Sequence, residues 1–444
     1  MDSLVKTLVE RNFGFSHGEL SVAGVSVGAL AKKYGTPAFI YSSKVLGEKL
    51  DALRRALPPQ FSVSYSVKAN PNQAVLRYFL SRGCGLEVAS AGELAKAIEA
   101  GCPPDRILFA GPGKTEAELE FALSRGSVEI HLESLTEAKR IAEISRRLGV
   151  RANVAIRVNP AGDAEGGAMR MGGRPAPFGV DEETFDEVLD VLLADRSLEF
   201  RGIHLFTGTQ ILGSSVLVSQ YRHGVGIARR VVQRVGHPLH TVDFGGGLGI
   251  PYFPHESELD LAALQSGLAE LFAGLQADTA FAGTRFLVEP GRFLVGEAGI
   301  YITRVNDIKV SRGKKFLILD GGMHHHLAAS GNLGQTIKRN YPVALANKLD
   351  MPAVEVVDVV GPLCTPLDTL ARNVHLPKAE IGDLFVILQS GAYARSASPL
   401  SFLSHPAPPE IWVDGEDHLL CAPDMQGHCR LPEEKLAHLG RNVD

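Results

Sequence analysis

The chain has 444 residues, of which 45% are hydrophobic, and its formal net charge is −5. This length exceeds what one compact core usually holds, and no basic block suggests binding to nucleic acid or to a membrane surface. No apolar run is long enough to span a bilayer, the first residues lack the features of a signal peptide, and the five cysteines include no CxxC pair. We therefore expect a reduced, cytoplasmic globular protein of two domains.

Short β-type runs alternate with amphipathic helical patterns from about residue 38 to residue 290. Repetition of strand and helix on this scale predicts a parallel sheet covered by helices, and about eight units have the size of a TIM barrel. A doubly wound sheet is the alternative. The expected strands are Ala38–Tyr41, Ser62–Val67, Gly85–Val88, Ile107–Ala110, Glu129–Leu132, Asn153–Val158, Phe200–Leu205, Thr241–Phe244 and Arg285–Val288.

The texture changes after about residue 295, where β-type runs are separated by Gly, Pro and Asp turns and long helical patterns are scarce. This pattern is typical of a separate β domain. We predict an α/β protein in which a TIM-like (β/α)8 barrel (residues 38–295) is followed by a C-terminal β domain (residues 296–444). Residues 1–37 fit neither part, and we expect them to pack on the β domain.

One lysine stands where a predicted strand ends. Lys68 follows the run Ser62–Val67 and precedes the turn Asn70–Asn72. It therefore lies at the carboxyl end of a strand, which is where α/β barrels keep their reactive groups. A lysine amine there can form a Schiff base with a carbonyl cofactor such as pyridoxal phosphate. An arbitrary lysine is more often a solvated surface residue.

Two further motifs follow predicted strands. Gly245–Gly247 can let the backbone approach a phosphate, although its order does not match a dinucleotide motif and such a run is often only a turn. In Glu289-Pro290-Gly291-Arg292, the arginine can hold a phosphate, and the glutamate can favour the protonated form of a pyridine nitrogen. An ordinary Glu–Arg surface pair is the alternative for that segment.

The predicted β domain carries two more candidates. Cys364, among the turn residues of Gly361–Asp368, is either a proton donor or a small buried residue. Tyr393 follows a strand and Gly391, and its hydroxyl either reaches a phosphate or lies in the core.

These five motifs, in this order, resemble the PLP-dependent decarboxylases of the alanine-racemase fold. Diaminopimelate decarboxylase and eukaryotic-type ornithine decarboxylase are familiar members. The resemblance covers about residues 35–413. It implies a TIM-like barrel that binds pyridoxal 5'-phosphate, a following β domain, and a head-to-tail homodimer with active sites shared across the interface.

The resemblance also implies roles for individual residues. Lys68 would hold the cofactor as a Schiff base, Glu289 would face the ring nitrogen, and Cys364 would arrive from the partner subunit to reprotonate the α-carbon. Arg157 matches an arginine near the cofactor, and Glu87 takes the place of an aspartate close to the lysine. The phosphate would be held by Thr209, Gly245, Gly246, Gly247, Gly291, Arg292 and Tyr393.

Three departures from the family pattern concern the substrate. Phe206 replaces a histidine that stacks on the cofactor ring, while His204 lies two residues earlier on the same strand face and is expected to point into the barrel. Thr365-Pro366 follows Cys364 where relatives carry an acid that helps to bind a distal ammonium group, although Asp368 is retained. The usual arginine-containing segment is also missing, and Gly321–Asn332 stands in its place.

That segment, with Met169–Gly173 and Ser398–His405, resembles a divergent subgroup of carrier-protein-linked or exosortase-associated decarboxylases. We therefore expect a substrate whose distal end is conjugated, either to an acyl carrier protein or to a citryl group. A diaminopimelate decarboxylase that makes L-lysine is the alternative. A racemase or a non-catalytic PLP-binding protein is a second alternative, which the length and the Gly361–Cys364 element disfavour.

The triplet His324–His326 invites a metal interpretation. Neighbouring residues of a strand point to opposite faces, so three in a row rarely ligate one ion, and we predict no metal. We instead expect His324 to line the substrate site with His204, Thr365 and Asp368.

Overall fold

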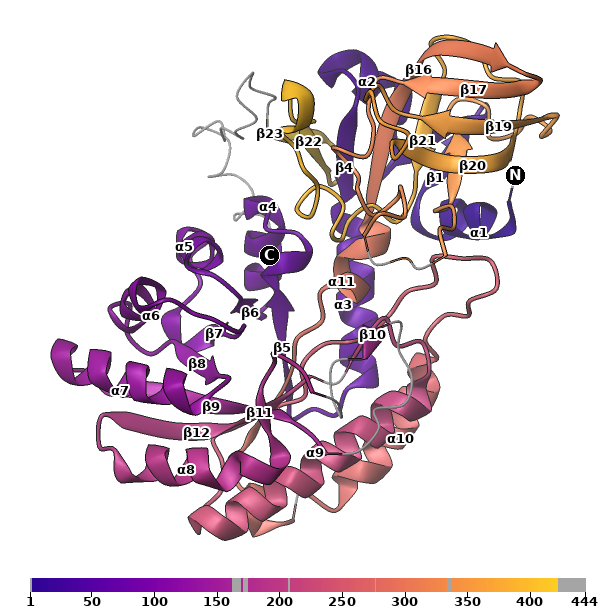
Figure 1. The fold of residues 1–444 in the computed structure, drawn as a ribbon. Helices are drawn as coiled ribbons and strands as arrows, with labels where there is room; N and C mark the ends of the chain where they lie inside the picture. The colour runs from indigo at the N-terminus through magenta and orange to yellow at the C-terminus, as the bar shows by residue number, and fades with distance from the viewer. Residues whose placement is uncertain are drawn as a thin grey trace. The chain divides into compact units, whose positions relative to one another are not determined.

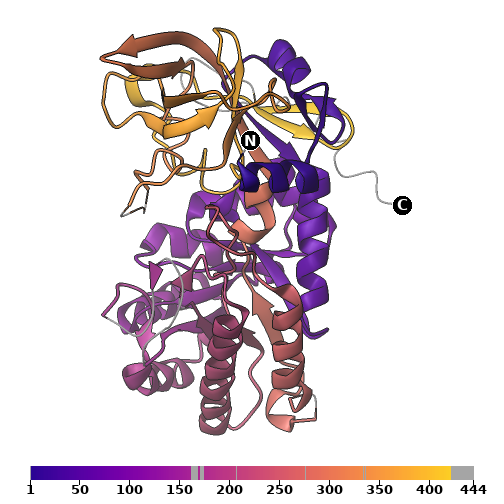
Figure 2. The same cartoon turned by 90° about the vertical axis from the view of Figure 1, so that its right-hand side faces the viewer.

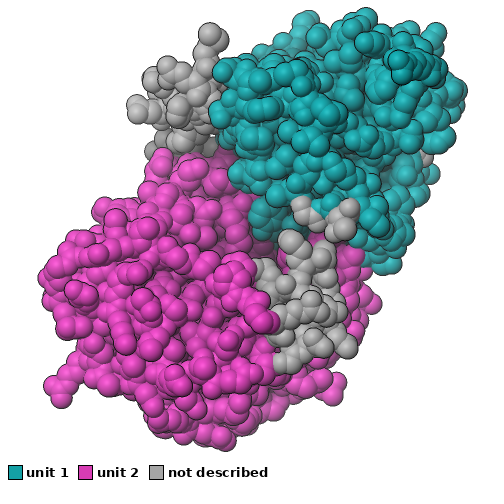
Figure 3. Space-filling view, viewed as in Figure 1, with its two compact units in different colours: residues 1–50, 251–257, 292–444 teal, residues 51–250, 258–291 magenta. Residues whose placement is uncertain are grey.

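The computed structural model describes residues 2–161, 169–170, 175–206, 208–275, 277–333, 335 and 337–421. The chain forms two compact units (Figure 3). We call residues 51–250 and 258–291 the barrel unit, and residues 1–50, 251–257 and 292–444 the sheet unit. Most of the predicted subgroup segment Met169–Gly173 lies outside the described residues. No helix in the described part of the chain is both long and apolar enough to cross a membrane.

Eight parallel strands close on themselves in the barrel unit (Figure 1). Each strand pairs with the next along the chain, and the last, β15, pairs with the first, β5, which confirms the predicted barrel and excludes the doubly wound sheet. The barrel strands are β5 (Phe61–Ser66), β6 (Gly85–Val88), β7 (Ile107–Phe109), β8 (Glu129–Leu132), β9 (Ala152–Asn159), β12 (Leu198–Leu205), β14 (Thr241–Asp243) and β15 (Arg285–Val288).

Helices connect these strands and lie outside them (Figure 1). Local signals fix their ends: in α7, Ser134 accepts a hydrogen bond from the N–H of Glu137 at the start, and Gly149 adopts a left-handed conformation at the end. Figure 2 shows α9 and α10 running side by side. The helices are α4 (Gln73–Ser81), α5 (Ala91–Glu99), α6 (Glu116–Leu123), α7 (Leu135–Leu148), α8 (Phe185–Ala194), α9 (Ser214–Val235) and α10 (Leu261–Ala273).

Aromatic rings fill the space between the strands and two of these helices. Phe61 of β5 lies 5.7 Å from Phe286 of β15, measured between ring centroids, and 4.9 Å from Phe272 of α10. Tyr221 of α9 stacks at 4.6 Å on Phe244, which follows β14. These contacts are in the range that favours aromatic pairs, and they hold α9 and α10 against the strands that carry the candidate site.

The sheet unit contains the predicted β domain. Its larger sheet has the order β20-β19-β17-β16-β4-β22-β23, and β21 and β18 extend it from β16. The strands are β4 (Ala38–Ser42), β16 (Gly299–Ser311), β17 (Lys314–Leu319), β18 (Val343–Leu345), β19 (Glu355–Val360), β20 (Thr369–Leu376), β21 (Leu384–Ile387), β22 (Glu410–Val413) and β23 (Asp417–Cys421).

One predicted barrel strand belongs to this sheet instead. β4 pairs antiparallel with β16 and parallel with β22. All five of its residues are buried, as they would be in a barrel strand, so its apolar character did not reveal which sheet it joins. α3 (Ser43–Ala56) then leads from the sheet unit into the barrel unit.

The first residues add a helix, a small three-stranded sheet and a second helix. Their apolar side chains share one core with the larger sheet, in which Val5, Leu8, Leu20 and Leu30 are buried together with Ile300 and other strand residues. These elements are α1 (Ser3–Asn12), β1 (Gly14–Ser16), β2 (Glu19–Val22), β3 (Val25–Ser26) and α2 (Val27–Tyr34).

Closure of the barrel depends on a glycine in β12. A Cβ atom on Gly202 would lie 1.7 Å from the carbonyl oxygen of Thr241 in the neighbouring strand β14. We expect Gly202→Ala to force these strands apart and to lower the free energy of unfolding by about 1–3 kcal/mol or more. Gly226→Ala in α9, where a Cβ atom would meet nothing within 4 Å, is the control and should be neutral or stabilising. Thermal unfolding followed by circular dichroism measures both, and equal melting temperatures for Gly202→Ala and the wild type would contradict the expectation.

Candidate active site

Lys68 lies just beyond the end of β5, in the short 3-10 turn Val67–Ala69. Its Nζ is 3.2 Å from each carboxylate oxygen of Glu87, which is buried at the end of β6. Ser66 donates its hydroxyl to the same carboxylate at 2.5 Å. The lysine side chain is 46% exposed, so an anchored carboxylate holds an amine that other molecules can reach.

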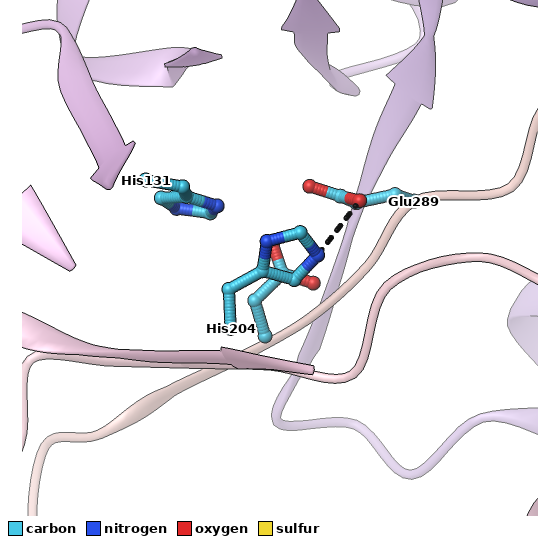
Figure 4. Close-up of side chains that lie close together, drawn as sticks. His131, His204 and Glu289 are labelled. Carbon is cyan, nitrogen blue, oxygen red and sulfur yellow. Dashed lines mark ion pairs between the residues drawn. The ribbon is translucent and has the colours of Figure 1, made fainter. Parts of the chain in front are cut away.

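A buried cluster of ionisable side chains lies inside the barrel (Figure 4). It consists of His131 on β8, His204 on β12, Asp243 on β14 and Glu289 just after β15, each offering one N or O atom within 4.8 Å of the others. His204 Nε2 lies 3.3 Å from Glu289 Oε2, and the rings of His131 and His204 are 4.7 Å apart. The register pairs His204 directly with Asp243, so both side chains point to the same face. We call these four residues the buried cluster.

The two carboxyl groups of the buried cluster cannot both be ionised at low cost. Burial raises the pKa of Asp243 well above its usual range, and the charge of Glu289 raises it further. Burial would also raise the pKa of Glu289, but His204, His131 and Lys68 hold it below its usual value. Burial lowers the pKa of His204 and Glu289 raises it; for the two carboxyl groups we assign an ionised Glu289 and a protonated Asp243.

With this proton assignment, the ionised carboxylate of Glu289 has one unused oxygen. Asp243 Oδ1 accepts the N–H of Gly245 at 2.8 Å. Glu289 Oε1 is buried and has no hydrogen-bond partner among the described residues. A buried carboxylate oxygen without a hydrogen-bond partner destabilises the fold. This oxygen is therefore suited to accept a hydrogen bond from a bound molecule.

A second buried ion pair lies beside the cluster. Arg157 on β9 donates to Glu133 at 2.7 Å, and Glu133 also accepts the N–H of Gly179 at 2.9 Å. The guanidinium carbon of Arg157 lies 5.1 Å from the centre of the Phe178 ring and 5.7 Å from that of Phe206. Arg157 therefore positions Phe206 by a cation–π contact, and its charge is already balanced by Glu133.

The glycine run has a packing reason that the sequence did not reveal. A Cβ atom on Gly245 would lie 2.5 Å from the carbonyl oxygen of Leu205, and one on Gly246 would lie 2.5 Å from that of Glu289. At Gly247 the nearest atom would be the carbonyl oxygen of Gly208, at 2.7 Å, in the short strand β13 (Gly208–Thr209). Larger side chains are therefore excluded by the backbone, and the run lies against the strand that carries Thr209.

Arg292 and Tyr393, two further predicted site residues, lie in the sheet unit. Arg292, which directly follows Gly291, donates to the hydroxyl of Tyr252 at 3.0 Å, and its guanidinium carbon is 4.8 Å from the centre of the Tyr393 ring. Tyr393 has a φ of 56°, a left-handed conformation that bulky residues rarely adopt. Tyr252 was missed from the sequence because it follows the glycine run without a motif of its own.

The loop that carries Cys364 is held by Asp368. The thiol of Cys364 is free and the residue is exposed. Asp368 is buried, and its two carboxylate oxygens accept the N–H groups of Met323 at 2.7 Å and Leu363 at 2.9 Å. Thr365 accepts the N–H of Leu367 within the same loop. Asp368 therefore joins two loops and has no carboxylate oxygen left without a backbone donor.

The three consecutive histidines are buried, and burial lowers their pKa values to about 4 for His324 and about 3 for His325 and His326. His325 contacts the hydroxyl of Tyr301 at 3.0 Å, and His326 contacts that of Ser390 at 3.0 Å. The ring of His324 lies 4.8 Å from that of His405 at an interplanar angle of 41°, and neither of its ring nitrogens has a partner among the described residues. His324 is therefore the one member of the triplet with ring nitrogens still available.

Comparison with known families agrees with this arrangement. Residues 44–296 match the family model described as pyridoxal-dependent decarboxylase, pyridoxal binding domain. This is more than half of the chain, and the chain therefore belongs to the pyridoxal-dependent decarboxylases. It is a carboxy-lyase of that family, as the sequence predicted.

Individual relatives cover most of the chain. It is 39% identical over 386 residues to the L-glutamyl-[BtrI acyl-carrier protein] decarboxylase of Niallia circulans, covering 86% of this chain and 90% of that one. It is 34% identical to the diaminopimelate decarboxylase of Aquifex aeolicus, covering 86% and 88%. It is 32% identical to the 2-[(L-alanin-3-ylcarbamoyl)methyl]-2-hydroxybutanedioate decarboxylase of Staphylococcus aureus, covering 84% and 93%.

A solved structure confirms the fold. The diaminopimelate decarboxylase of M. jannaschii in complex with L-lysine superposes with a TM-score of 0.85 at 25% identity, covering 93% of this chain and 95% of that one.

The proton assignment in the buried cluster can be tested on the cofactor-free protein. Because folding raises the pKa of Asp243, this group binds a proton in the folded state between its unfolded pKa and its folded pKa, and it lowers stability as the pH rises through that window. Asp243→Asn keeps the acceptor for Gly245 and supplies an N–H in place of the carboxyl proton. We expect the variant to match or exceed the wild type in stability at pH 7, with a weaker loss of stability from pH 4 upward.

Urea unfolding at a series of pH values measures this difference. Asp243→Ala is the control, since it removes the acceptor for the Gly245 N–H and should cost about 1–3 kcal/mol. If Asp243→Asn lost as much stability at pH 7 as Asp243→Ala, the carboxyl would have to be ionised, and our assignment would be wrong.

Proposed function

We propose that the chain binds pyridoxal 5'-phosphate at Lys68 and removes the α-carboxylate of an amino acid whose distal end is conjugated, as in a glutamyl group on an acyl carrier protein. The single observation that carries the substrate class is the state of Asp368. It is the only acid that follows Cys364 within the loop Gly361–Asp368, and both of its carboxylate oxygens accept backbone N–H groups. This loop therefore offers a free distal ammonium only one carboxylate, which is buried and already bonded to two backbone N–H groups.

The residues of the barrel unit fit the cofactor. Lys68 supplies an exposed amine at the end of a barrel strand, and Glu289 supplies a buried, ionised carboxylate with an unused oxygen, suited to a protonated pyridine nitrogen. Phe206, fixed by Arg157, offers a ring face of the kind that stacks on a planar group. Gly245–Gly247 and Thr209 remain our candidates for the phosphate. The assignment of Gly291, Arg292 and Tyr393 to the phosphate stays a prediction from the family resemblance.

When bound, the cofactor supplies a ring that accepts the electron pair left behind as carbon dioxide departs. The protein's part is to hold charge and to move protons. Glu87 keeps the Lys68 amine in place, and the cluster residues His204 and Asp243 keep Glu289 ionised. Cys364, a free and exposed thiol, is our candidate for returning a proton to the α-carbon, from the partner subunit of a homodimer.

A conjugated substrate agrees with the relatives. The relative at 39% identity is named for a glutamyl group on a carrier protein, and the relative at 32% identity is named for an alanin-3-yl group joined through a carbamoyl group. In both names the amino acid is attached to something larger. A glutamyl group whose α-carboxylate is to be removed must be attached through its side-chain carboxyl, which leaves no distal charge to neutralise.

Diaminopimelate decarboxylation is the second candidate. The 34% identity to a diaminopimelate decarboxylase and the structural match to another favour it. Two features disfavour diaminopimelate as the substrate, because its distal ammonium and carboxylate need charged partners. No acid directly follows Cys364, where Thr365-Pro366 stands, and the carboxylate of Asp368 already accepts backbone N–H groups.

The role of Lys68 gives a direct test. We expect Lys68→Ala to lower turnover by more than about a thousandfold, which is the scale of losing a group that reacts directly, and to abolish the absorbance of a Schiff base with pyridoxal phosphate. Lys96→Ala, an exposed lysine of α5, is the control and should behave as the wild type. Dialysis against EDTA should leave turnover unchanged. Steady-state decarboxylation by Lys68→Ala close to the wild-type rate would overturn the proposal.

The substrate class is tested by mass spectrometry on the cofactor-loaded protein. The panel consists of meso-diaminopimelate, L-lysine, L-ornithine, L-arginine, L-glutamate, and the BtrI carrier protein charged with L-glutamate through its side-chain carboxyl. We expect loss of carbon dioxide, a mass decrease of one CO₂ unit, from the charged carrier protein alone. Fast conversion of diaminopimelate to lysine would instead establish the second candidate and show that Thr365 does not exclude a distal ammonium.

A further inference from the structure

A cavity of about 750 Å³ lies within the sheet unit. Its walls come from residues 252–255, from residues 338–345, which include β18, from the end of β20, and from the start of α1. We call it the basic cleft because of the charges described next. It contains none of the residues of the buried cluster.

The lining of the basic cleft is strongly positive. It includes the cations Lys338, Arg339, Lys348 and Arg372, the histidines His255 and His375, and one carboxylate, Asp2. Asp2 is used locally, since it accepts the N–H of Leu4 and caps α1. The whole chain has a net charge of −5, so this concentration of positive charge runs against the balance of the protein.

Three of these cations have no acidic partner in the part of the chain that the structure describes. Lys348 is neutralised, because it lies 2.8 Å from Asp383 and 3.1 Å from Glu380. Lys338, Arg339 and Arg372 are exposed and form no ion pair there. A group of arginines and a lysine without carboxylates in a concave site is suited to an anion, and guanidinium groups favour a phosphate.

One side of the basic cleft is held by contacts that continue along the chain to Arg292. Arg339 lies 2.7 Å from His255 Nε2, and its guanidinium carbon is 5.3 Å from the centre of the Phe253 ring. Next along the chain is Tyr252, which accepts a hydrogen bond from Arg292. Arg292 directly follows Gly291 in the segment that carries Glu289. The basic cleft therefore extends from its exposed cations to Tyr252, which contacts Arg292.

We infer that the basic cleft binds the phosphate of the pantetheine arm on an acyl carrier protein. The arm joins the carried group to the protein through a phosphodiester, so a substrate of this kind presents one fixed negative charge at a distance from the reacting amino acid. Arg339 and Arg372 bind this phosphate, and Tyr252 and Tyr341, whose rings are 4.8 Å apart, line the inner wall. The inference rests on the proposed carrier-linked substrate and adds the place where the carrier's arm is recognised.

The test compares two thioesters of L-glutamate, each attached through the side-chain carboxyl. One is the thioester of pantetheine and the other is that of 4'-phosphopantetheine, so they differ only in the phosphate. We expect the wild-type enzyme to show a KM at least about tenfold lower for the phosphorylated thioester, with a similar kcat. In Arg339→Ala/Arg372→Ala this preference should disappear, while the KM for the unphosphorylated thioester stays unchanged. Added salt should weaken the preference of the wild type.

Arg106→Ala/Arg196→Ala is the matched control. It removes two exposed arginines of the barrel unit that precede β7 and β12, far along the chain from the basic cleft, and it should keep the wild-type preference. Turnover of the unphosphorylated thioester by each variant shows that the protein is folded and loaded with cofactor.

The two levels of the proposal fail differently. If both thioesters are decarboxylated with equal KM by the wild type, the substrate class stands and the phosphate site is wrong. If neither thioester nor the charged carrier protein is decarboxylated, the proposed function itself fails. If the cleft variant dissociates into monomers in sedimentation experiments while the control does not, the basic cleft is an interface between copies of this chain and the inference is overturned.

Discussion

Asp243 and Glu289 occupy the same dry interior, and this constraint shapes the candidate site. The strands that end at these residues, β14 and β15, are neighbours in a closed barrel, so the two carboxyl groups are forced together. Two adjacent negative charges in a buried site are expensive, and one group must keep a proton. Placing the proton on Asp243 leaves Glu289 as a fixed negative charge with one unused oxygen. Inside the barrel, Glu289 Oε1 is therefore the atom suited to bind a positively charged hydrogen-bond donor.

Several charged groups outside the buried cluster are already paired. Arg157 is balanced by Glu133, and the Lys68 amine contacts both oxygens of Glu87. In the sheet unit, the carboxylate of Asp368 accepts two backbone N–H groups. A ligand can therefore draw strong new interactions from few groups, and the engaged Asp368 favours a substrate with an uncharged distal end.

The sequence predicted the barrel because short β-type runs alternate with amphipathic helical patterns about eight times between residues 38 and 290. Predicted strand ends pointed to Lys68 and Glu289, and the family resemblance added Glu87 and Arg157. The structure places Lys68 just beyond β5, Glu87 and Arg157 near the ends of β6 and β9, and Glu289 just after β15. Their chemical roles stay predictions. The sequence misplaced β4, because a strand buried on both faces has the same pattern in a barrel and in the centre of another sheet.

Other parts of the candidate site were out of reach of sequence patterns. His131 and Asp243 belong to strands β8 and β14, which are far apart along the chain, and only closure of the barrel brings their side chains within a few ångströms of each other. Gly245 and Gly246 suggested a phosphate site. In the structure, glycine is required at these positions because the backbone carbonyls of Leu205 and Glu289 leave no room for a side chain. A tight turn can serve both purposes, since the same lack of a side chain that lets strands meet also leaves N–H groups accessible to an anion.

The basic cleft extends this reasoning from the reacting end of the substrate to its far end. A small free amino acid must be recognised by charges close to its reacting end, and Asp368, the acid retained in the Cys364 loop, is already bonded to two backbone N–H groups. A conjugated amino acid carries its distinguishing charge elsewhere, and binding energy gained from a remote part of a substrate can still be used for catalysis. Lys338, Arg339 and Arg372 provide such a remote charge, without acidic partners in the described chain. The absence of an acid directly after Cys364 and the presence of a positive cleft both fit the same substrate, one at each of its ends.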